Sequence, residues 1–289
     1  MQKRGWLPWI FVAPALLILG FFLLYPSLNT FYLSLFDKTS EDFVGFHNYV
    51  FALTSDVMLT AFRNNLLWLV VFTGVTVSLG VIFAVMFDRI RWEPWAKAAI
   101  FLPMAISFVG AGVIWKFVYA FRPAGAAQIG LLNGFLTLIP GFQPQGWLIE
   151  KSVNNFALIA VGIWIWTGFC TITLSAAYKS IPREILEAAR VDGANEVQVF
   201  FRVILPMMMS TILVVATTMV VNVLKVFDVV YVMTNGNFDT EVMANRMYKE
   251  MFHFRHFGRA SAIAVILLLA IIPVMLFNIR NFRQQEAMR

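Results

Sequence analysis

The chain has 289 residues, of which 60% are hydrophobic and only 13% are charged. A soluble domain carries roughly 25% charged residues, so this chain lacks the polar surface of a water-facing globule, and a lipid bilayer suits it better. The net charge of +6 does not indicate nucleic-acid binding, because the basic residues do not gather into one patch. The single cysteine, Cys170, excludes an internal disulfide, and no Cys/His cluster has metal-binding spacing.

Six mostly apolar segments are long enough to cross a bilayer, which requires about 20 such residues. They predict transmembrane helices at about 9–35, 65–87, 98–121, 156–178, 205–226 and 260–279. The first segment resembles a signal peptide, but it is about twice as long and no small-residue cleavage site follows it, so a retained span is expected. No internal repeat or linker divides the chain, so residues 1–289 are expected to form one all-α, polytopic membrane domain.

The distribution of Lys and Arg predicts the orientation of these spans. If the N-terminus is cytoplasmic, the inner segments hold twelve of the 22 basic residues in about 54 positions, and the three outer loops hold eight in about 94. The denser side is the cytoplasmic one, so both termini are expected in the cytoplasm.

The fourth predicted span contains one helix face that combines an aromatic ring, a gap and a hydroxyl. Trp164, Gly168 and Thr171 follow one another at i, i+4 and i+7. Such a face suits a sugar, whose C–H surface stacks on rings and whose hydroxyls need hydrogen-bond partners. The alternative is a tryptophan that faces lipid or a neighbouring helix, with Gly168 as a packing notch.

The segment 179–204, between spans four and five, holds the densest charge of the chain and predicts a cytoplasmic helix–turn–helix. Pro182 suits a first helical turn, Asp192-Gly193 is a turn pair, and Asn195 with Gln198 forms the pattern of a capping box. An apolar stripe at helical spacing follows, made of Val197, Phe200, Phe201 and Ile204. A plain connector would need only a few polar residues. A helix lying on the membrane surface would favour Lys and Arg on its polar face, whereas this segment is mainly acidic. We therefore expect a docking element for a cytoplasmic protein.

The end of the fifth predicted span carries three polar residues at or near membrane depth. They are Asn222, Lys225 and Asp228, spaced by three positions each. Polar groups there are costly unless they are paired or face a cavity, so they are candidates for the substrate path. The alternative is that Lys225 and Asp228 pair with each other at the outer boundary, with Lys225 reaching toward water.

The stretch "EAARVDGANEVQVFFRVILP" resembles the signature loop of ABC-transporter inner-membrane permeases. That signature is Glu-Ala-Ala, three residues, Gly, nine residues, Ile, any residue and Leu-Pro. The matching positions here are Glu187, Ala188, Ala189, Gly193, Leu205 and Pro206, with Val203 in place of the Ile. Asp192 before the glycine and "SIP" before the loop resemble the carbohydrate-uptake, maltose-transporter-like branch, as do "FLPMAIS" and "VYVMTNG". That branch continues the last motif with Gly-Pro, where this chain has Asn237 and Phe238.

The resemblance implies a fold, a function and a set of partners. The loop would seat on a cytoplasmic ATPase subunit, with Glu187 in the ion pair, Gly193 at the bend, and Phe200, Phe201 and Ile204 holding it to the membrane part. The chain would import a sugar, a di- or oligosaccharide, through a bacterial or archaeal cytoplasmic membrane. Its partners would be a second permease, two ATPase subunits that hold ATP and Mg, and an extracytoplasmic solute-binding protein. The chain itself would bind no cofactor and no metal.

Three other functions are alternatives to sugar import. A permease for glycerol phosphate or another polar solute shares the same loop, and Lys225 would then meet the anion. A secondary transporter usually shows two similar halves and more spans. An integral-membrane enzyme needs a catalytic motif, and the sequence has none of the common hydrolase, metalloprotease or nucleotide-binding patterns, so the chain is not expected to be an enzyme.

Overall fold

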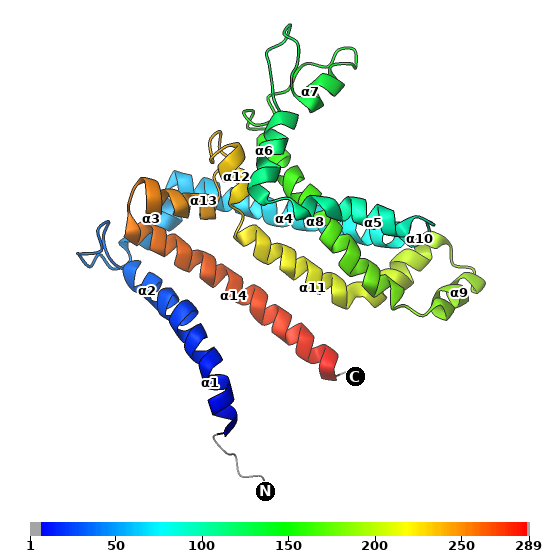
Figure 1. Cartoon of the computed structure of the whole chain (residues 1–289), viewed down its shortest axis with the longest axis horizontal. Helices are drawn as coiled ribbons and strands as arrows, with labels where there is room; N and C mark the ends of the chain where they lie inside the picture. Colours follow the sequence, from blue (N-terminus) through cyan, green and yellow to red (C-terminus); the bar gives the residue numbers. More distant parts are fainter. Residues whose placement is uncertain (1–6, 288–289) are drawn as a thin grey trace. The chain divides into compact units, whose positions relative to one another are not determined.

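The structure is a computed structural model that describes residues 7–287, and within this range it is built from helices. Figure 1 shows their arrangement along the chain. The α-helices are α1 (Leu7–Leu19), α2 (Tyr25–Leu33), α3 (His47–Thr54), α4 (Asp56–Phe87), α5 (Glu93–Phe101), α6 (Phe108–Val118), α7 (Leu131–Leu136), α8 (Asn154–Lys179), α9 (Arg183–Val191), α10 (Glu196–Val199), α11 (Leu205–Leu224), α12 (Asp228–Met233), α13 (Met243–Tyr248) and α14 (Phe257–Ala287). The all-α fold class predicted from the sequence is confirmed.

Five helical segments are long and apolar enough to cross a membrane, and a bent helix pair makes a sixth. The five are Trp9–Leu33, Asp56–Phe87, Asn154–Lys179, Glu196–Leu224 and Phe257–Leu276, all within the described residues. They match five of the six predicted spans. Helix α4 begins at Asp56, nine residues before the predicted start at position 65.

The third predicted span, 98–121, corresponds to this bent pair and is not one straight helix. The chain bends by 100° between Glu93–Ala105 and Phe108–Val118. Pro103 lies in a 3₁₀ turn (Leu102–Ala105) that ends α5, since proline cannot donate the next helical hydrogen bond. Ser107 then starts α6 as its N-cap, accepting a hydrogen bond from the Gly110 N–H at 3.1 Å.

The described chain divides into two compact units, which we describe separately. The first comprises the chain up to Leu59 and Arg246–Leu269. In it the buried Asn48 amide donates to the Ser34 and Phe36 carbonyls at 2.9 and 2.6 Å. The single membrane domain over residues 1–289 stays a prediction.

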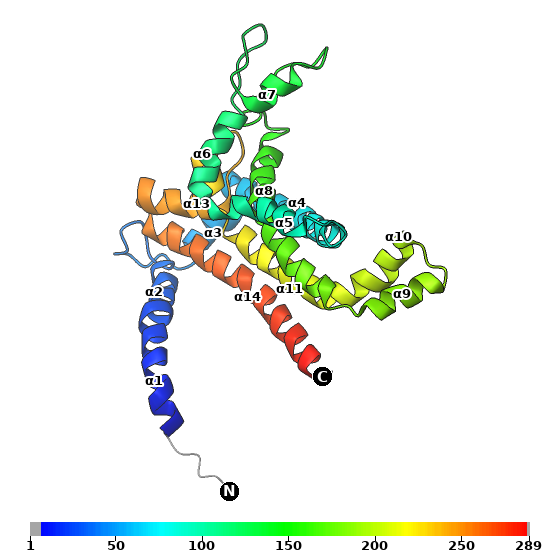
Figure 2. The ribbon, with the colours of Figure 1, turned by 45° about the vertical axis from the view of Figure 1, so that its right-hand side comes forward.

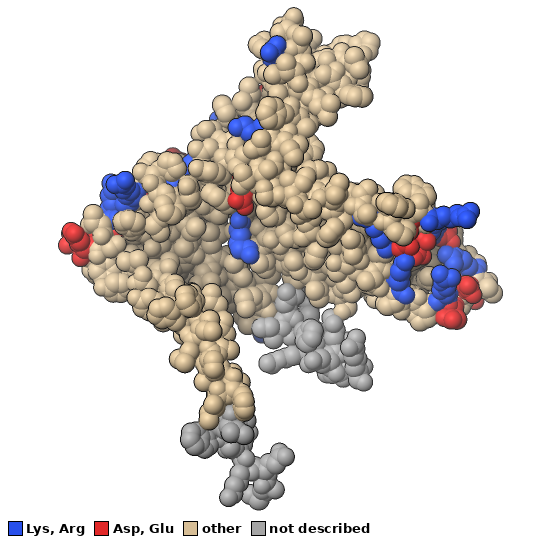
Figure 3. Space-filling model, viewed as in Figure 1, with Lys and Arg blue, Asp and Glu red and all other residues tan. Residues whose placement is uncertain are grey.

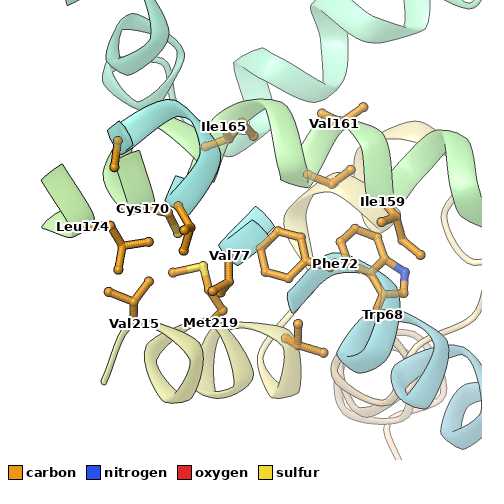
Figure 4. Close-up of a cluster of buried hydrophobic side chains, with 14 of the residues drawn as sticks. Trp68, Phe72, Val77, Ile159, Val161, Ile165, Cys170, Leu174, Val215 and Met219 are labelled. Atoms are coloured by element: carbon orange, nitrogen blue, oxygen red, sulfur yellow. The ribbon is translucent and has the colours of Figure 1, made fainter. Parts of the chain in front are cut away.

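The second unit comprises Thr60–Asn245 and the chain from Ala270 onward. Its central helix is α8, which contacts α5, α6, α11 and α12; Figures 1 and 2 show α5 and α11 running beside it. The side chains between α4, α8 and α11 form an apolar core (Figure 4), which includes Trp68, Phe72, Val77, Ile159, Val161, Ile165, Cys170, Leu174, Val215 and Met219. Gly80 lets α4 approach α8 closely, because a Cβ there would lie 2.6 Å from the Cβ of Cys170.

Candidate functional site

Span five is interrupted where its polar residues lie. Helix α11 ends at Leu224, Lys225 follows with φ −106° and ψ 9°, and Phe227 is non-helical with φ −143° and ψ −62°. Helix α12 then begins with Asp228. Each charge suits its helix end, since a cation favours a helix C-terminus and an anion favours the first turn. The prediction of an unbroken span to position 226 therefore overlooked a break at Lys225.

A pocket of about 250 Å³ opens at this break, and the three predicted polar residues all line it. Its other lining residues are Trp68 and Phe72 of α4, Phe108 of α6, Gly162 and Trp166 of α8, and Val223, Val226, Phe227 and Val229 around the break. Trp166 and Phe108 stack, with ring centroids 6.1 Å apart and planes 25° from parallel. A largely apolar, aromatic pocket with a few polar groups is the usual form of a small-molecule site.

The polar side chains of this pocket differ in their partners. Asn222 Nδ2 donates to the Thr218 carbonyl at 2.9 Å. Among residues 7–287, no ion pair joins Lys225 to Asp228. The alternative that these two side chains simply neutralise each other is therefore not observed.

The predicted face of span four does not line this pocket. A Cβ on Gly168 would collide with the backbone of α5 at Ile100, and the buried Thr171 hydroxyl donates to the Thr167 carbonyl at 2.8 Å. Trp164 packs edge-to-face on Trp115, with centroids 5.6 Å apart. These contacts are those of the packing-notch alternative, and a role for the three residues in the substrate path stays a prediction.

The pocket residue that sequence reasoning missed is Trp166. It lies two positions after Trp164, on a face that it shares with Gly162 at i−4. This face repeats the same pattern of a ring and a gap, so the sequence contained the signal twice. Only the packing of α8 against α4 decides which face meets the pocket: a Cβ on Gly162 would lie 3.0 Å from the Trp68 ring.

The segment between spans four and five forms the predicted helix–turn–helix. Helix α9 ends before Gly193, which has φ +84°, a conformation that glycine adopts at little cost. Asn195 accepts from the Gln198 N–H and the Gln198 side chain accepts from the Asn195 N–H, both at 2.9 Å. The predicted capping box is confirmed.

Two details of this segment differ from the prediction. Pro182 is the residue before α9 and not part of its first turn. The second helix is not separate from span five, because α10 passes through a π-helical turn (Phe200–Ile204) directly into α11. Ile204 is buried and Phe200 packs on the core, but Phe201 is 60% exposed and so does not hold the loop to this unit.

Charged side chains gather at the end of the second unit that carries α9 and α10, as Figure 3 shows. Glu196 accepts one hydrogen bond from Arg89, two residues after the end of α4, and a second from Arg190 Nε at 2.8 Å. The hydrogen bond and the charge of Glu196 raise the pKa of the Arg190 guanidinium above its usual value. Glu93 forms ion pairs with Lys97 at 2.5 Å and with Lys179 at 2.7 Å.

The signature residues of the loop lie on its surface. Glu187 is exposed and makes no ion pair among the described residues, and Ala188, Asp192 and Gly193 are exposed too. Ala189 is half-buried and packs on the core. Leu205 and Pro206 form the first turn of α11. Within residues 7–287, no group of three or more His, Cys, Asp or Glu side chains could hold a metal ion.

Comparisons with known proteins show the relationships of the chain. The profile of the family described as "binding-protein-dependent transport system inner membrane component" matches residues 3–281. The osmoprotective compounds uptake permease protein GgtC of Synechocystis sp. is 64% identical over 97% of this chain and 100% of its own length. The alpha-glucoside transport system permease protein AglF of Rhizobium meliloti is 47% identical over 96% of this chain and 83% of its own. A crystal structure of a bacterial ABC transporter that imports alginate has a chain with the same fold, with TM-score 0.79 and 22% identity over 98% of this chain and 96% of that one.

Proposed function

Because the chain belongs to the family of binding-protein-dependent transport system inner membrane components, we propose that it is the permease subunit of an ABC importer that carries a sugar, a di- or oligosaccharide, into the cytoplasm. The multi-pass chain forms the membrane path and leaves ATP hydrolysis to other subunits. The 47% identical relative named for alpha-glucosides supports a sugar as the substrate.

The pocket at the break in span five is the observation that carries this proposal. Trp166, Phe108 and Trp68 offer ring faces, and Asn222 offers a polar group beside them. Rings match the C–H faces of a sugar, and the amide matches its hydroxyls. Asp228 lies in the same pocket as Lys225, which disfavours glycerol phosphate or another anion as the substrate, because the carboxylate repels it.

The loop around Gly193 supports the proposed partners. Glu187 is exposed and makes no ion pair among residues 7–287, and the same loop exposes Val191 (87%) and Val197 (65%). This mixture of charge and apolar surface suits docking into a groove of an ATPase subunit. Two such subunits holding ATP and Mg, a second permease and an extracytoplasmic solute-binding protein would complete the transporter. Both termini would lie in the cytoplasm of a bacterium or archaeon, as the Lys and Arg distribution favours.

A second substrate class has its own support. The 64% identical relative is named for osmoprotective compounds, and Lys225 and Asp228 place opposite charges in one pocket with aromatic rings. That combination suits a zwitterionic osmoprotectant such as a betaine, whose cationic end binds ring faces. In cells that lack the gene and carry it on a plasmid, uptake of a radiolabelled alpha-glucoside and of a labelled betaine separates the two classes.

The Asn222→Ala variant tests the pocket itself. Loss of one hydrogen bond to the substrate costs about 1 kcal/mol, so the apparent KM for sugar uptake should rise about fivefold while the amount of protein in the membrane stays unchanged. Thr218→Val, one turn earlier on α11 and outside the pocket lining, is the matched control. An unchanged KM for Asn222→Ala would remove this residue from the site, and failure to take up any sugar would refute the proposed substrate class.

A further inference from the structure

The loop 234–242, which follows α12, has an unusual backbone. Four of its residues have positive φ: Asn235 at 52°, Gly236 at 72°, Phe238 at 56° and Asp239 at 64°. Positive φ is uncommon for residues with a side chain and is a clear outlier for a bulky one such as phenylalanine. Such conformations persist only where the surrounding structure determines them. The loop therefore depends on contacts from outside itself.

Two pairs of adjacent asparagines supply these contacts. Asn64 Nδ2 donates to the carbonyls of Asp239 and Glu241 at 2.7 and 2.8 Å, and Asn154 Nδ2 donates to the Phe238 carbonyl at 2.7 Å. Their sequence neighbours contribute as well. Asn65 Oδ1 accepts from the N–H of Met243, the first residue after the loop, at 2.9 Å, and Asn155 Nδ2 lies 3.4 Å from the Asp239 carbonyl. All four asparagines are buried, where an amide that loses its partner is costly.

These pairs lie on one side of the candidate pocket. On α4, Asn64 precedes the pocket residue Trp68 by about one turn, and on α8, Asn155 precedes Gly162 by about two turns. Asn65 Nδ2 also donates to the carbonyl of Val223, in the pocket wall, at 3.4 Å. Both helices run inward in the proposed orientation, so the asparagines and the loop they hold lie between the pocket and the outside.

We propose that Asn64, Asn65, Asn154 and Asn155 form a latch that closes the pocket toward the outside, and that their release from the loop 234–242 admits the substrate. The direction in this statement rests on the proposed function. When the asparagines release the loop, its positive-φ residues can relax toward ordinary backbone angles. The strain that is relieved offsets part of the free energy of the hydrogen bonds that are lost. This offset lowers the free energy needed to open the loop, and a gate that a substrate or partner can shift requires such a small difference between its states.

The Asn154→Asp variant removes one latch contact and places a carboxylate at a buried position opposite the Phe238 carbonyl, which it repels. Asn154 Oδ1 accepts from the Asn155 N–H at 2.7 Å, and an aspartate keeps this acceptor and suits the first turn of α8. It cannot donate to the Phe238 carbonyl. Asn64→Ala, which removes two donated hydrogen bonds, is the stronger variant. Asn48→Asp is the matched control, because Asn48 is also buried and donates to two carbonyls, in the other compact unit.

Chemical labelling in intact cells reads the state of the latch without requiring transport or a known substrate. The reporter is the pocket residue Val226 replaced as Val226→Cys, in a Cys170→Ala background, and the probe is a membrane-impermeant maleimide added outside. Asn154→Asp should raise the labelling rate about tenfold and Asn64→Ala should raise it further, and Asn48→Asp should not raise it. An unchanged rate in both latch variants, or an equal rise in Asn48→Asp, would overturn the proposal.

A second reporter separates this proposal from the proposed orientation. Ser180 is exposed at the C-terminal end of α8, which lies on the cytoplasmic side in the proposed orientation. Ser180→Cys should therefore react only in inverted vesicles. If Ser180→Cys reacts in intact cells instead, the orientation of the proposed function is wrong, and the latch is then tested by labelling Val226→Cys in inverted vesicles with the same expected rise. Membrane-inserted amounts of each variant are measured by immunoblot, so that a folding defect is not taken for an open latch.

Discussion

Two connections of the second unit, the 234–242 loop and the 180–195 loop, are held in different ways. The first is tied by buried neutral amides that donate to its carbonyls, with four positive-φ residues between them. The second is held at its surface by ion pairs: Glu196, the residue directly after the loop, accepts hydrogen bonds from Arg89 and Arg190. Buried hydrogen bonds are costly to break, whereas exposed ion pairs contribute little and weaken with salt. Opening the first loop therefore requires breaking buried hydrogen bonds, whereas the second loop can adjust to a partner at little cost.

The largest effect on folding should come from placing the same methyl group in the two loops. A Cβ on Gly236 would contact the Glu241 carboxylate and lie 2.8 Å from the Asn245 amide, whereas a Cβ on Gly193 meets nothing within 4 Å. Gly236→Ala should cost about 2–4 kcal/mol through crowding and positive φ. Gly193→Ala should cost about 1 kcal/mol through positive φ alone. Thermal unfolding of the detergent-solubilised protein, followed by size-exclusion chromatography, measures both, and equal shifts would contradict the comparison.

Gly193→Val should abolish uptake while the chain still inserts into the membrane. A β-branched side chain does not tolerate φ +84°, so α9 would meet α10 at a different angle and the ATPase subunit would not seat. Gly193→Asn is the control, since asparagine accepts positive φ more readily. Co-purification of the ATPase subunit and sugar uptake are measured together, and normal values of both for Gly193→Val would show that the loop is only a connector.

Glu187→Lys should reduce uptake by a smaller factor, with no change in folding. The side chain is exposed and unpaired among the described residues, so inverting its charge disturbs only a contact with a partner. Glu184→Lys, on the same helix, is the control for a general change of charge. Reduced retention of the ATPase subunit is expected for Glu187→Lys alone; the same loss in both variants would assign the effect to net charge rather than to this position.

The smallest effect is expected from Glu196→Gln, which removes the negative charge that Arg89 and Arg190 share. All three side chains are about half exposed, so solvent and salt already screen the pairs. The thermal unfolding temperature should fall slightly at low salt and not at all at high salt. A large, salt-independent fall would show that the 180–195 loop is held as tightly as the 234–242 loop.

Much of this molecule follows from local sequence, because local interactions determine it. Six apolar segments, the turn at Gly193 and the capping box of Asn195 and Gln198 depend only on residues close together in the chain. The grouping of Asn222, Lys225 and Asp228 was also predicted, because polar residues at membrane depth need a cavity or a partner.

Tertiary structure decided the rest, because it depends on which surface each helix presents to its neighbours. Both faces of span four hold a ring and a gap, and the close approach of α4 at Gly162 turned Trp166, rather than Trp164, toward the pocket. The break after Leu224 leaves backbone groups that only a folded environment can satisfy, and there Asn65 donates to the Val223 carbonyl. The two asparagine pairs are about 90 positions apart in the chain, and nothing in the sequence alone indicates that they meet at one loop.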